Sequence, residues 1–238
     1  MVGPVVLLVH AFPLDARMWE VQAAVLEQAG YETVAPNLPG REPDNDLTRW
    51  AERVLELLPG PFLPVGCSMG GYLMFELWRQ AADRIASAVF IDTRATADTP
   101  EQRQGREDTI RLLGEDGFEL FWEKTQAPKL FAPGAPREVV ERARAIAAQQ
   151  PIANLVATLQ ALARRPDSRE TAAGIDVPAL VLVGEQDQLT PPSDAEELAE
   201  LIPLARLVRI PDAGHLTPLE RPNEVNEELL VFLQQVAQ

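Results

Sequence analysis

The chain contains one cysteine and two histidines among its 238 residues. The single cysteine, Cys67, cannot form a disulfide within the chain and cannot supply a cysteine cluster for a metal. We therefore expect neither a disulfide framework nor a metal site. The scarcity of histidine limits the candidates for a catalytic base: if the reaction needs an imidazole, that imidazole belongs to His10 or His215.

Positive charge is also scarce. Lys and Arg number 21 against 36 Asp and Glu, which gives a formal net charge of -15. Such a chain repels phosphate backbones and anionic lipids, so neither nucleic acid nor a membrane is an expected partner. No stretch approaches the length of a membrane span, and the first apolar run, residues 5–9, is too short for a secretory signal. We expect a cytoplasmic protein, a monomer or homodimer, that acts on small molecules.

What the sequence does contain is a regular alternation of apolar runs and amphipathic stretches. Apolar runs typical of buried parallel strands lie at residues 5–9, 33–35, 62–67, 86–91, 179–183 and 205–210. Helical stretches follow them at residues 18–29, 46–58, 69–82, 193–201 and 224–235. This alternation predicts an α/β fold with a doubly wound, mostly parallel sheet of about six strands.

The alternation stops between residues 95 and 170. Helical stretches punctuated by proline and glycine fill this segment, at residues 101–113, 117–124, 137–149 and 152–164. We predict a helical lid over residues 95–170, inserted into a core that residues 1–94 and 171–238 form.

The most informative stretch is the run that ends in Ser68, with Gly66 and Gly70 two residues away on either side. A strand, a sharp turn and a helix in this order hold a serine in a strained conformation with its hydroxyl exposed, and the glycines avoid clashes at the turn. The Met69 amide would then lie at the positive end of a helix, where an N–H stabilises an oxyanion. Alone, the pattern also fits a glycine-rich turn in an ordinary α/β protein.

A serine nucleophile needs a base and an acid that orients the base. His215 follows the last predicted strand in a loop, and Asp187 follows the strand before it. An orienting acid is expected between the serine and the histidine in chain order, and all three groups would meet at the carboxyl edge of the sheet. Asp92, which follows the strand at residues 86–91, remains an alternative acid.

Four signatures in order resemble the α/β-hydrolases of the serine esterase and lactonase type. They are His10-Ala11-Phe12-Pro13, Gly66-Cys67-Ser68-Met69-Gly70-Gly71, Gly184-Glu185-Gln186-Asp187 with Thr190-Pro191, and Gly214-His215. Residues 163–168 and 175–178 further resemble the branch of 3-oxoadipate enol-lactonases and small carboxylesterases. The resemblance implies Ser68 as nucleophile, His215 as base and Asp187 as its orienting acid. It also implies an oxyanion hole from the backbone N–H groups of Phe12 and Met69.

The chain departs from that family at two points. Family members usually begin with a short antiparallel pair of strands, for which this sequence has no room, and they carry His-Gly where this chain has His10-Ala11. We therefore expect a fold that lacks the N-terminal antiparallel strands. We expect the Ala11 methyl group to restrict the oxyanion turn, and we expect His10 to be a structural hydrogen-bonding residue of that turn.

These observations predict a cofactor-free serine hydrolase that cleaves small carboxylic esters or lactones through an acyl-enzyme. Other reactions use the same triad: enol-lactone hydrolysis, thioester hydrolysis, C–C bond hydrolysis and haloperoxidase chemistry. A ligand receptor on a hydrolase scaffold is the alternative from a different class. In the lid, Phe118, Phe121 and Trp122 are predicted to line an apolar substrate pocket, although the same aromatics also suit a contact that fixes the lid to the core.

Overall fold

The computed structural model describes residues 5–39 and 44–236. Its six strands form one sheet in the order β2-β1-β3-β4-β5-β6, and each neighbouring pair is parallel. The strands are β1 (Val5–Val9), β2 (Thr33–Val34), β3 (Phe62–Cys67), β4 (Ala88–Ile91), β5 (Ala179–Gly184) and β6 (Ala205–Ile210). The predicted doubly wound parallel sheet is therefore confirmed.

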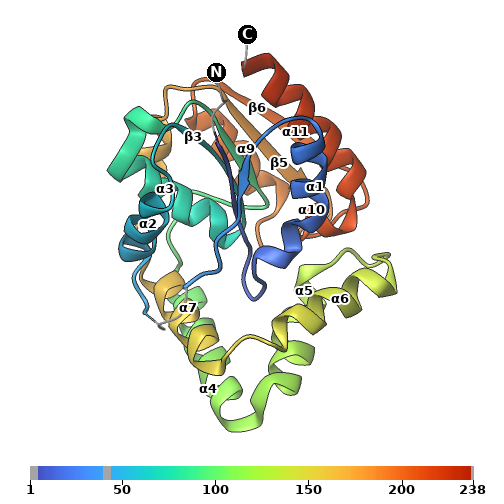
Figure 1. Ribbon diagram of the computed structural model, residues 1–238. Coiled ribbons are helices and arrows are strands. Elements are labelled where there is room, and N and C mark those ends of the chain that lie inside the picture. Colours follow the sequence, from blue (N-terminus) through green and yellow to red (C-terminus); the bar gives the residue numbers. More distant parts are fainter. Residues whose placement is uncertain (1–4, 40–43, 237–238) are drawn as a thin grey trace.

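Helices cover both faces of this sheet, because successive side chains of a strand point to opposite faces. In β1, Val6 and Leu8 pack toward one apolar cluster, whereas Leu7 and Val9 pack toward another. Figure 1 shows the two layers on either side of the sheet. One layer holds α1 (Glu20–Gln28) and α11 (Pro222–Val236), and the other holds α2 (Leu47–Glu56), α3 (Met69–Ala81), α8 (Arg169–Ala173) and α9 (Pro192–Leu201).

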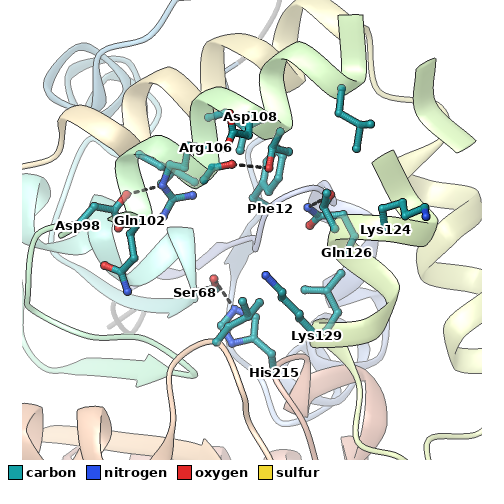
Figure 2. Close-up of a pocket in the computed structure, with 18 of the residues that line it drawn as sticks. Phe12, Ser68, Asp98, Gln102, Arg106, Asp108, Lys124, Gln126, Lys129 and His215 are labelled. Atoms are coloured by element: carbon teal, nitrogen blue, oxygen red, sulfur yellow. Dashed lines mark hydrogen bonds and ion pairs between the residues drawn. The ribbon is translucent and has the colours of Figure 1, made fainter. Parts of the chain in front are cut away.

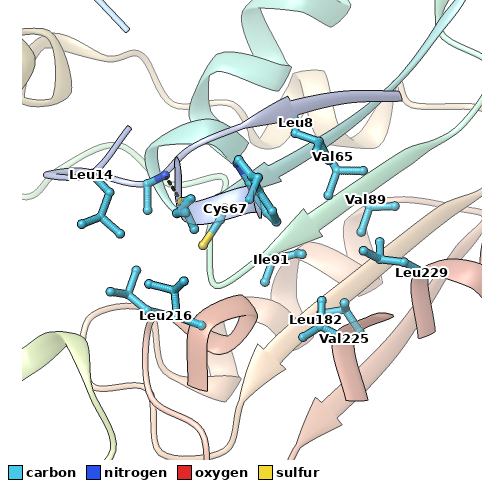
Figure 3. Packing of buried hydrophobic residues seen from close by; sticks show 14 of the residues in the cluster. Leu8, Leu14, Val65, Cys67, Val89, Ile91, Leu182, Leu216, Val225 and Leu229 are labelled. Carbon is cyan, nitrogen blue, oxygen red and sulfur yellow. Dashed lines mark hydrogen bonds between the residues drawn. The ribbon is translucent and has the colours of Figure 1, made fainter. Parts of the chain in front are cut away.

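The apolar cluster on the α11 face extends to the carboxyl edge of the sheet. Figure 3 shows the strand side chains of this cluster facing Leu216, Val225 and Leu229 from the C-terminal part of the chain. Cys67 is fully buried in it, and burial raises the pKa of its thiol well above the ordinary value. These properties suit a packing residue better than a nucleophile.

The strand order places a crevice at one point of the carboxyl edge. From β1 the chain passes to β2 on one side and then to β3 on the other, so the winding direction reverses between β1 and β3. Ligands of doubly wound sheets bind at such a reversal. The loops that flank it here follow β1 and β3, and they carry Phe12 and Ser68.

Helices between β4 and β5 cover this edge, at the bottom of Figure 1. They are α4 (Pro100–Phe121), the π-helical turn η3 (Trp122–Gln126), α5 (Ala127–Leu130), α6 (Arg137–Ala147) and α7 (Ile152–Arg164). Two separate helices were expected at 101–113 and 117–124. The range of α4 joins two helical segments at Gly117, whose φ of 79° and ψ of -174° are not helical, and the second segment continues into η3. Glycine tolerates this positive φ, so the expected break between the two helices lies there. Within residues 5–39 and 44–236, no helix combines the length and the apolar character needed to cross a membrane.

Candidate active site

Ser68 occupies the turn between β3 and α3, with φ 53° and ψ -111°. A non-glycine residue in this region stores about 1–3 kcal/mol of strain, which the surroundings must offset. Hydrogen bonds to β4 and to the loop after it hold the Ser68 backbone: its N–H donates to the Ile91 carbonyl at 2.8 Å, and its carbonyl accepts from the Thr93 hydroxyl at 2.9 Å. A Cβ atom at Gly70 would lie 2.1 Å from the Val9 carbonyl oxygen, so this position of the turn requires glycine.

The imidazole of His215 lies between Ser68 and Asp187. Its Nε2 is 2.7 Å from the Ser68 Oγ, and its Nδ1 is 2.8 Å from the Asp187 Oδ2. Figure 2 shows the contact between Ser68 and His215 at the base of a cavity. The three residues come from the loops after β3, β5 and β6, so the carboxyl edge of the sheet brings together the serine, acid and histidine that the sequence singled out.

Both oxygens of the Asp187 carboxylate accept hydrogen bonds from the loop after β5. Its Oδ1 accepts the backbone N–H groups of Leu189 at 2.8 Å and Thr190 at 3.0 Å, and its Oδ2 accepts the Thr190 hydroxyl at 2.7 Å. A carboxylate that accepts from His215 Nδ1 selects the tautomer with the proton on Nδ1, which leaves Nε2 free to accept the Ser68 proton.

Burial and charge act in opposite directions on this pair. Burial favours the neutral imidazole, but the charge and hydrogen bond of Asp187 outweigh it and hold the pKa of His215 above 6.5. Burial likewise favours the protonated acid, yet His215 and the hydrogen bonds from Thr190 hold the pKa of Asp187 below 3.8. The pair therefore stabilises a positive charge on the imidazole, as a base needs when it accepts a proton.

Asp92, the alternative acid, lies completely buried beside this pair. Its oxygens accept hydrogen bonds from Gly184 N–H at 3.0 Å, from Thr217 N–H at 3.0 Å and from the Thr217 hydroxyl at 2.8 Å. Within the described residues none of its hydrogen bonds reaches the ring of His215. Burial and the nearby charge of Asp187 raise its pKa to about 8. These contacts tie the loop after β4 to β5 and to the segment after His215.

The two expected oxyanion donors flank Ser68. Met69 is the first residue of α3, Phe12 lies in the turn after β1, and the hydrogen bonds of the described chain leave both backbone N–H groups without a partner. Ala11 does not need the backbone freedom of glycine at this turn, since its φ is not positive, and its methyl group is fully buried in an apolar cluster. His10 braces the turn: its Nδ1 lies 3.0 Å from the Ala11 carbonyl oxygen, and its Nε2 accepts the Leu38 N–H at 2.9 Å. Burial lowers the pKa of His10, in keeping with a neutral ring.

A cavity of about 800 Å³ opens above Ser68 and His215, between the sheet edge and the lid helices. Tyr72 of α3 and the loops after β1, β4 and β5 contribute to its walls, the loops through Phe12, Arg94, Asp98, Leu189 and Thr190. The other walls come from α4, η3, α5 and α7. Among the described residues, no group of three or more His, Cys, Asp or Glu is arranged to hold a metal ion.

The aromatic residues expected to line this cavity lie elsewhere. None of Phe118, Phe121 and Trp122 belongs to its walls. Phe118 stacks on Trp122 with ring centroids 6.2 Å apart, and Phe121 meets Phe12 edge to face at 6.1 Å. The contact of Phe121 with the turn after β1 makes these residues part of the attachment of the lid to the core, which corrects the expectation of an aromatic substrate pocket.

The structure adds residues to the site that the sequence did not single out. The Glu220 carboxylate accepts the N–H of Gly214 at 3.0 Å and the N–H of Ala132 at 2.8 Å, and so bridges the histidine loop and the lid. No local pattern marks Glu220, because both its partners are backbone groups, and Ala132 is distant in sequence. The cavity wall also contains Lys124 and Lys129, which a count of residue types would have marked as the only lysines of the chain.

Comparison with known proteins agrees with this geometry. Residues 6–228 match the Alpha/beta hydrolase family. Because the match covers nearly the whole sequence, the chain belongs to the α/β-hydrolase family.

Solved structures give a finer comparison. A thermophilic esterase from Thermogutta terrifontis, solved with malate bound, shares 32% identity with a TM-score of 0.91, covering 99% of this chain and 91% of that one. An enol-lactonase from Burkholderia xenovorans shares 24% identity with a TM-score of 0.87 over 98% and 92% of the two chains. A bromoperoxidase from Bacillus anthracis shares 22% identity with a TM-score of 0.82 over 98% and 92%. The last two likenesses establish the fold alone.

Proposed function

We propose that this chain is a serine hydrolase that cleaves small carboxylic esters or lactones through an acyl-enzyme. The observation that carries the proposal is the hydrogen-bonded series from Ser68 through His215 to Asp187, with spacings of 2.7 and 2.8 Å, at the base of a cavity. A serine in this arrangement has a base within proton-transfer distance, and the base has a fixed tautomer.

The reaction proceeds in two halves. His215 Nε2 takes the Ser68 proton as the Oγ attacks the carbonyl carbon, and the N–H groups of Phe12 and Met69 stabilise the oxyanion that forms. The intermediate then collapses to an ester on Ser68, and the leaving alkoxide takes the proton from His215. Water attacks this acyl-enzyme with His215 again as base, which releases the acid and restores the Ser68 hydroxyl.

Ester hydrolysis is preferred among the reactions that share this triad because of the likeness to the Thermogutta terrifontis esterase at 32% identity. The enol-lactonase and the bromoperoxidase lie under 25% identity, so they do not favour their own reactions for this chain. Lactones stay within the proposal because their ring opening is the same acyl transfer, with the leaving alkoxide still attached to the acyl group.

The test is turnover of 4-nitrophenyl acetate and butyrate by the native chain and by Ser68→Ala, with mass spectrometry to detect the acyl group on the protein. We expect multiple turnovers and an acyl adduct on Ser68 for the native chain, and neither for the variant. Ser87→Ala is the matched control, since the Ser87 hydroxyl is buried at the amino end of β4 and has no hydrogen-bond partner in the described chain. A native chain that binds the esters without turning over would identify a receptor.

A further inference from the structure

Both lysines of the chain lie in the wall of the active-site cavity. All other basic residues are arginines, and they are distributed along the whole sequence. Lys124 belongs to η3 and Lys129 to α5, and both side chains are exposed to solvent. An ammonium group differs from a guanidinium in being a compact point charge with three rotatable donors, which suits a single carboxylate that arrives from solution.

The arginines of the same wall are already engaged. Arg94 and Arg106 both pair with the Asp98 carboxylate, and Arg111 pairs with Asp108 at 3.0 Å. In contrast, neither lysine makes an ion pair or a hydrogen bond within the described part of the chain. The wall also contains three exposed acids of α4 that make no ion pair within the described residues: Glu101 in its first turn, and Glu115 and Asp116 just before the kink at Gly117. The two lysines are therefore the cavity cations left to meet an anionic ligand.

The lysines differ in their relation to the triad. Figure 2 shows the Lys129 ammonium group turned into the cavity on the side of Ser68 and His215, whereas Lys124 extends away from them. The backbone beside Lys129 is held near the histidine loop, because the Leu130 carbonyl accepts the backbone N–H of His215 at 3.1 Å. This hydrogen bond joins the end of α5 to the histidine loop, and Lys129 is the residue before Leu130 in the sequence.

We propose that Lys129 binds a carboxylate on the acyl part of the substrate, so that the preferred substrates are half-esters of small dicarboxylic acids. The assignment rests on the proposed ester or lactone hydrolysis and names its substrate class. A net charge of -15 repels an anion from most of the surface, so a substrate of this kind needs a local cation where it binds.

The test compares two substrates with the same skeleton. One is 4-nitrophenyl hydrogen glutarate, whose free acid is ionised at neutral pH, and the other is the same compound with that acid capped as a methyl ester. Release of nitrophenol gives kcat/KM for each, and their ratio cancels effects on the triad. We expect Lys129→Met to lower the ratio of anionic to capped substrate about tenfold, which corresponds to about 1.4 kcal/mol. Lys129→Arg should restore most of it because the charge is kept.

Lys124→Met is the matched control, since it removes the same charge from the same wall at a site directed away from the triad. Its ratio should stay near the native value. An unchanged ratio in Lys129→Met, or an equal fall in Lys124→Met, would overturn the assignment while leaving ester hydrolysis intact.

A binding measurement separates this assignment from the reaction itself. Titration of glutarate into Ser68→Ala by calorimetry should show saturable binding, which Lys129→Met in the same background should abolish. Glutarate binding that does not depend on Lys129 rejects the assignment. If the native chain hydrolyses neither ester, the proposed reaction fails, and this titration still decides the role of Lys129.

Discussion

Replacing Asp187 with asparagine changes one group of the side chain and leaves its shape intact. The amide oxygen can keep the hydrogen bonds from the N–H groups of Leu189 and Thr190, so the amide nitrogen must face His215 Nδ1. That nitrogen can only donate, which makes Nδ1 an acceptor and moves the ring proton to Nε2. The ring then cannot take the Ser68 proton, and we expect kcat/KM to fall by roughly 10³ to 10⁴ with the fold preserved.

Replacing Asp92 with asparagine should instead lower the stability of the fold and largely preserve activity. Besides the Cys67 thiol at 3.9 Å, the hydrogen-bond donors to Asp92 are Gly184 and Thr217, which supply two backbone N–H groups to different oxygens. An amide nitrogen must face one of these N–H groups, and a buried donor without an acceptor costs about 1–3 kcal/mol. For a chain of this size that lowers Tm by roughly 2–12 °C. Activity per folded molecule should stay within about tenfold of native, because Asp92 makes no hydrogen bond to the His215 ring in the described chain and its pKa of about 8 leaves it mostly uncharged at neutral pH.

The assay is kcat/KM for a nitrophenyl ester, measured well below the lowest Tm, together with Tm from circular dichroism. Asp176→Asn, at an exposed aspartate before β5, is the control that should change neither quantity. The expected pattern is a loss of activity without loss of stability for Asp187→Asn, and the reverse for Asp92→Asn. The opposite ranking of activities would make Asp92 the orienting acid and refute the reasoning from hydrogen bonds.

Further predictions concern pH, the turn and the lid. Since burial is outweighed by Asp187 and the pKa of His215 lies above 6.5, the ring is protonated at low pH, and kcat/KM should rise with pH through a midpoint above 6.5; a profile with no acidic limb, measured with acylation rate-limiting, would contradict a histidine base. Gly70→Ala should lose about 1–3 kcal/mol of unfolding free energy and much of the activity, because its Cβ would lie 2.1 Å from the Val9 carbonyl oxygen. Gly105→Ala in α4, where a Cβ meets open space, should instead leave stability equal or raise it by up to about 1 kcal/mol, and equal effects in denaturant unfolding would contradict the turn geometry. Phe121→Ala should cost about 3–5 kcal/mol and depress the turnover of short and long esters alike, whereas a change in chain-length preference would return this ring to the substrate pocket.

The core was predictable from sequence because its strands are buried on both faces. Continuous apolar runs such as the one in β5 mark such strands, and the polar residue that follows each run falls at the carboxyl edge. Ser68, Asp187 and His215 could therefore be placed together before their contacts were known. The choice between Asp187 and Asp92 could not be made this way, because both follow a strand and only the hydrogen bonds of the folded loops distinguish them.

The lid was less predictable for a physical reason. Helical spacing shows that Phe118, Phe121 and Trp122 share a side of the chain, but it does not show whether that side meets a cavity or another element. The φ of 79° at Gly117 turns the end of α4 so that Phe121 reaches Phe12, and sequence periodicity carries no information about such a bend. Sequence pattern also left out α10 (Thr217–Glu220), which is a single turn and too short to show a period.

Backbone contacts join the lid to the loop that carries His215. The Leu130 carbonyl accepts the His215 N–H at 3.1 Å, and Glu220 binds the backbone of both segments. The segments also touch without side chains between them, since a Cβ at Gly214 would lie 2.4 Å from the Ala132 nitrogen. A movement of α5 relative to the sheet would therefore displace the imidazole from Ser68. The end of α5 is therefore joined to the histidine loop by backbone contacts, whereas the side chains of α4 meet the cavity without a hydrogen bond, in the described chain, to the loops after β3, β5 and β6.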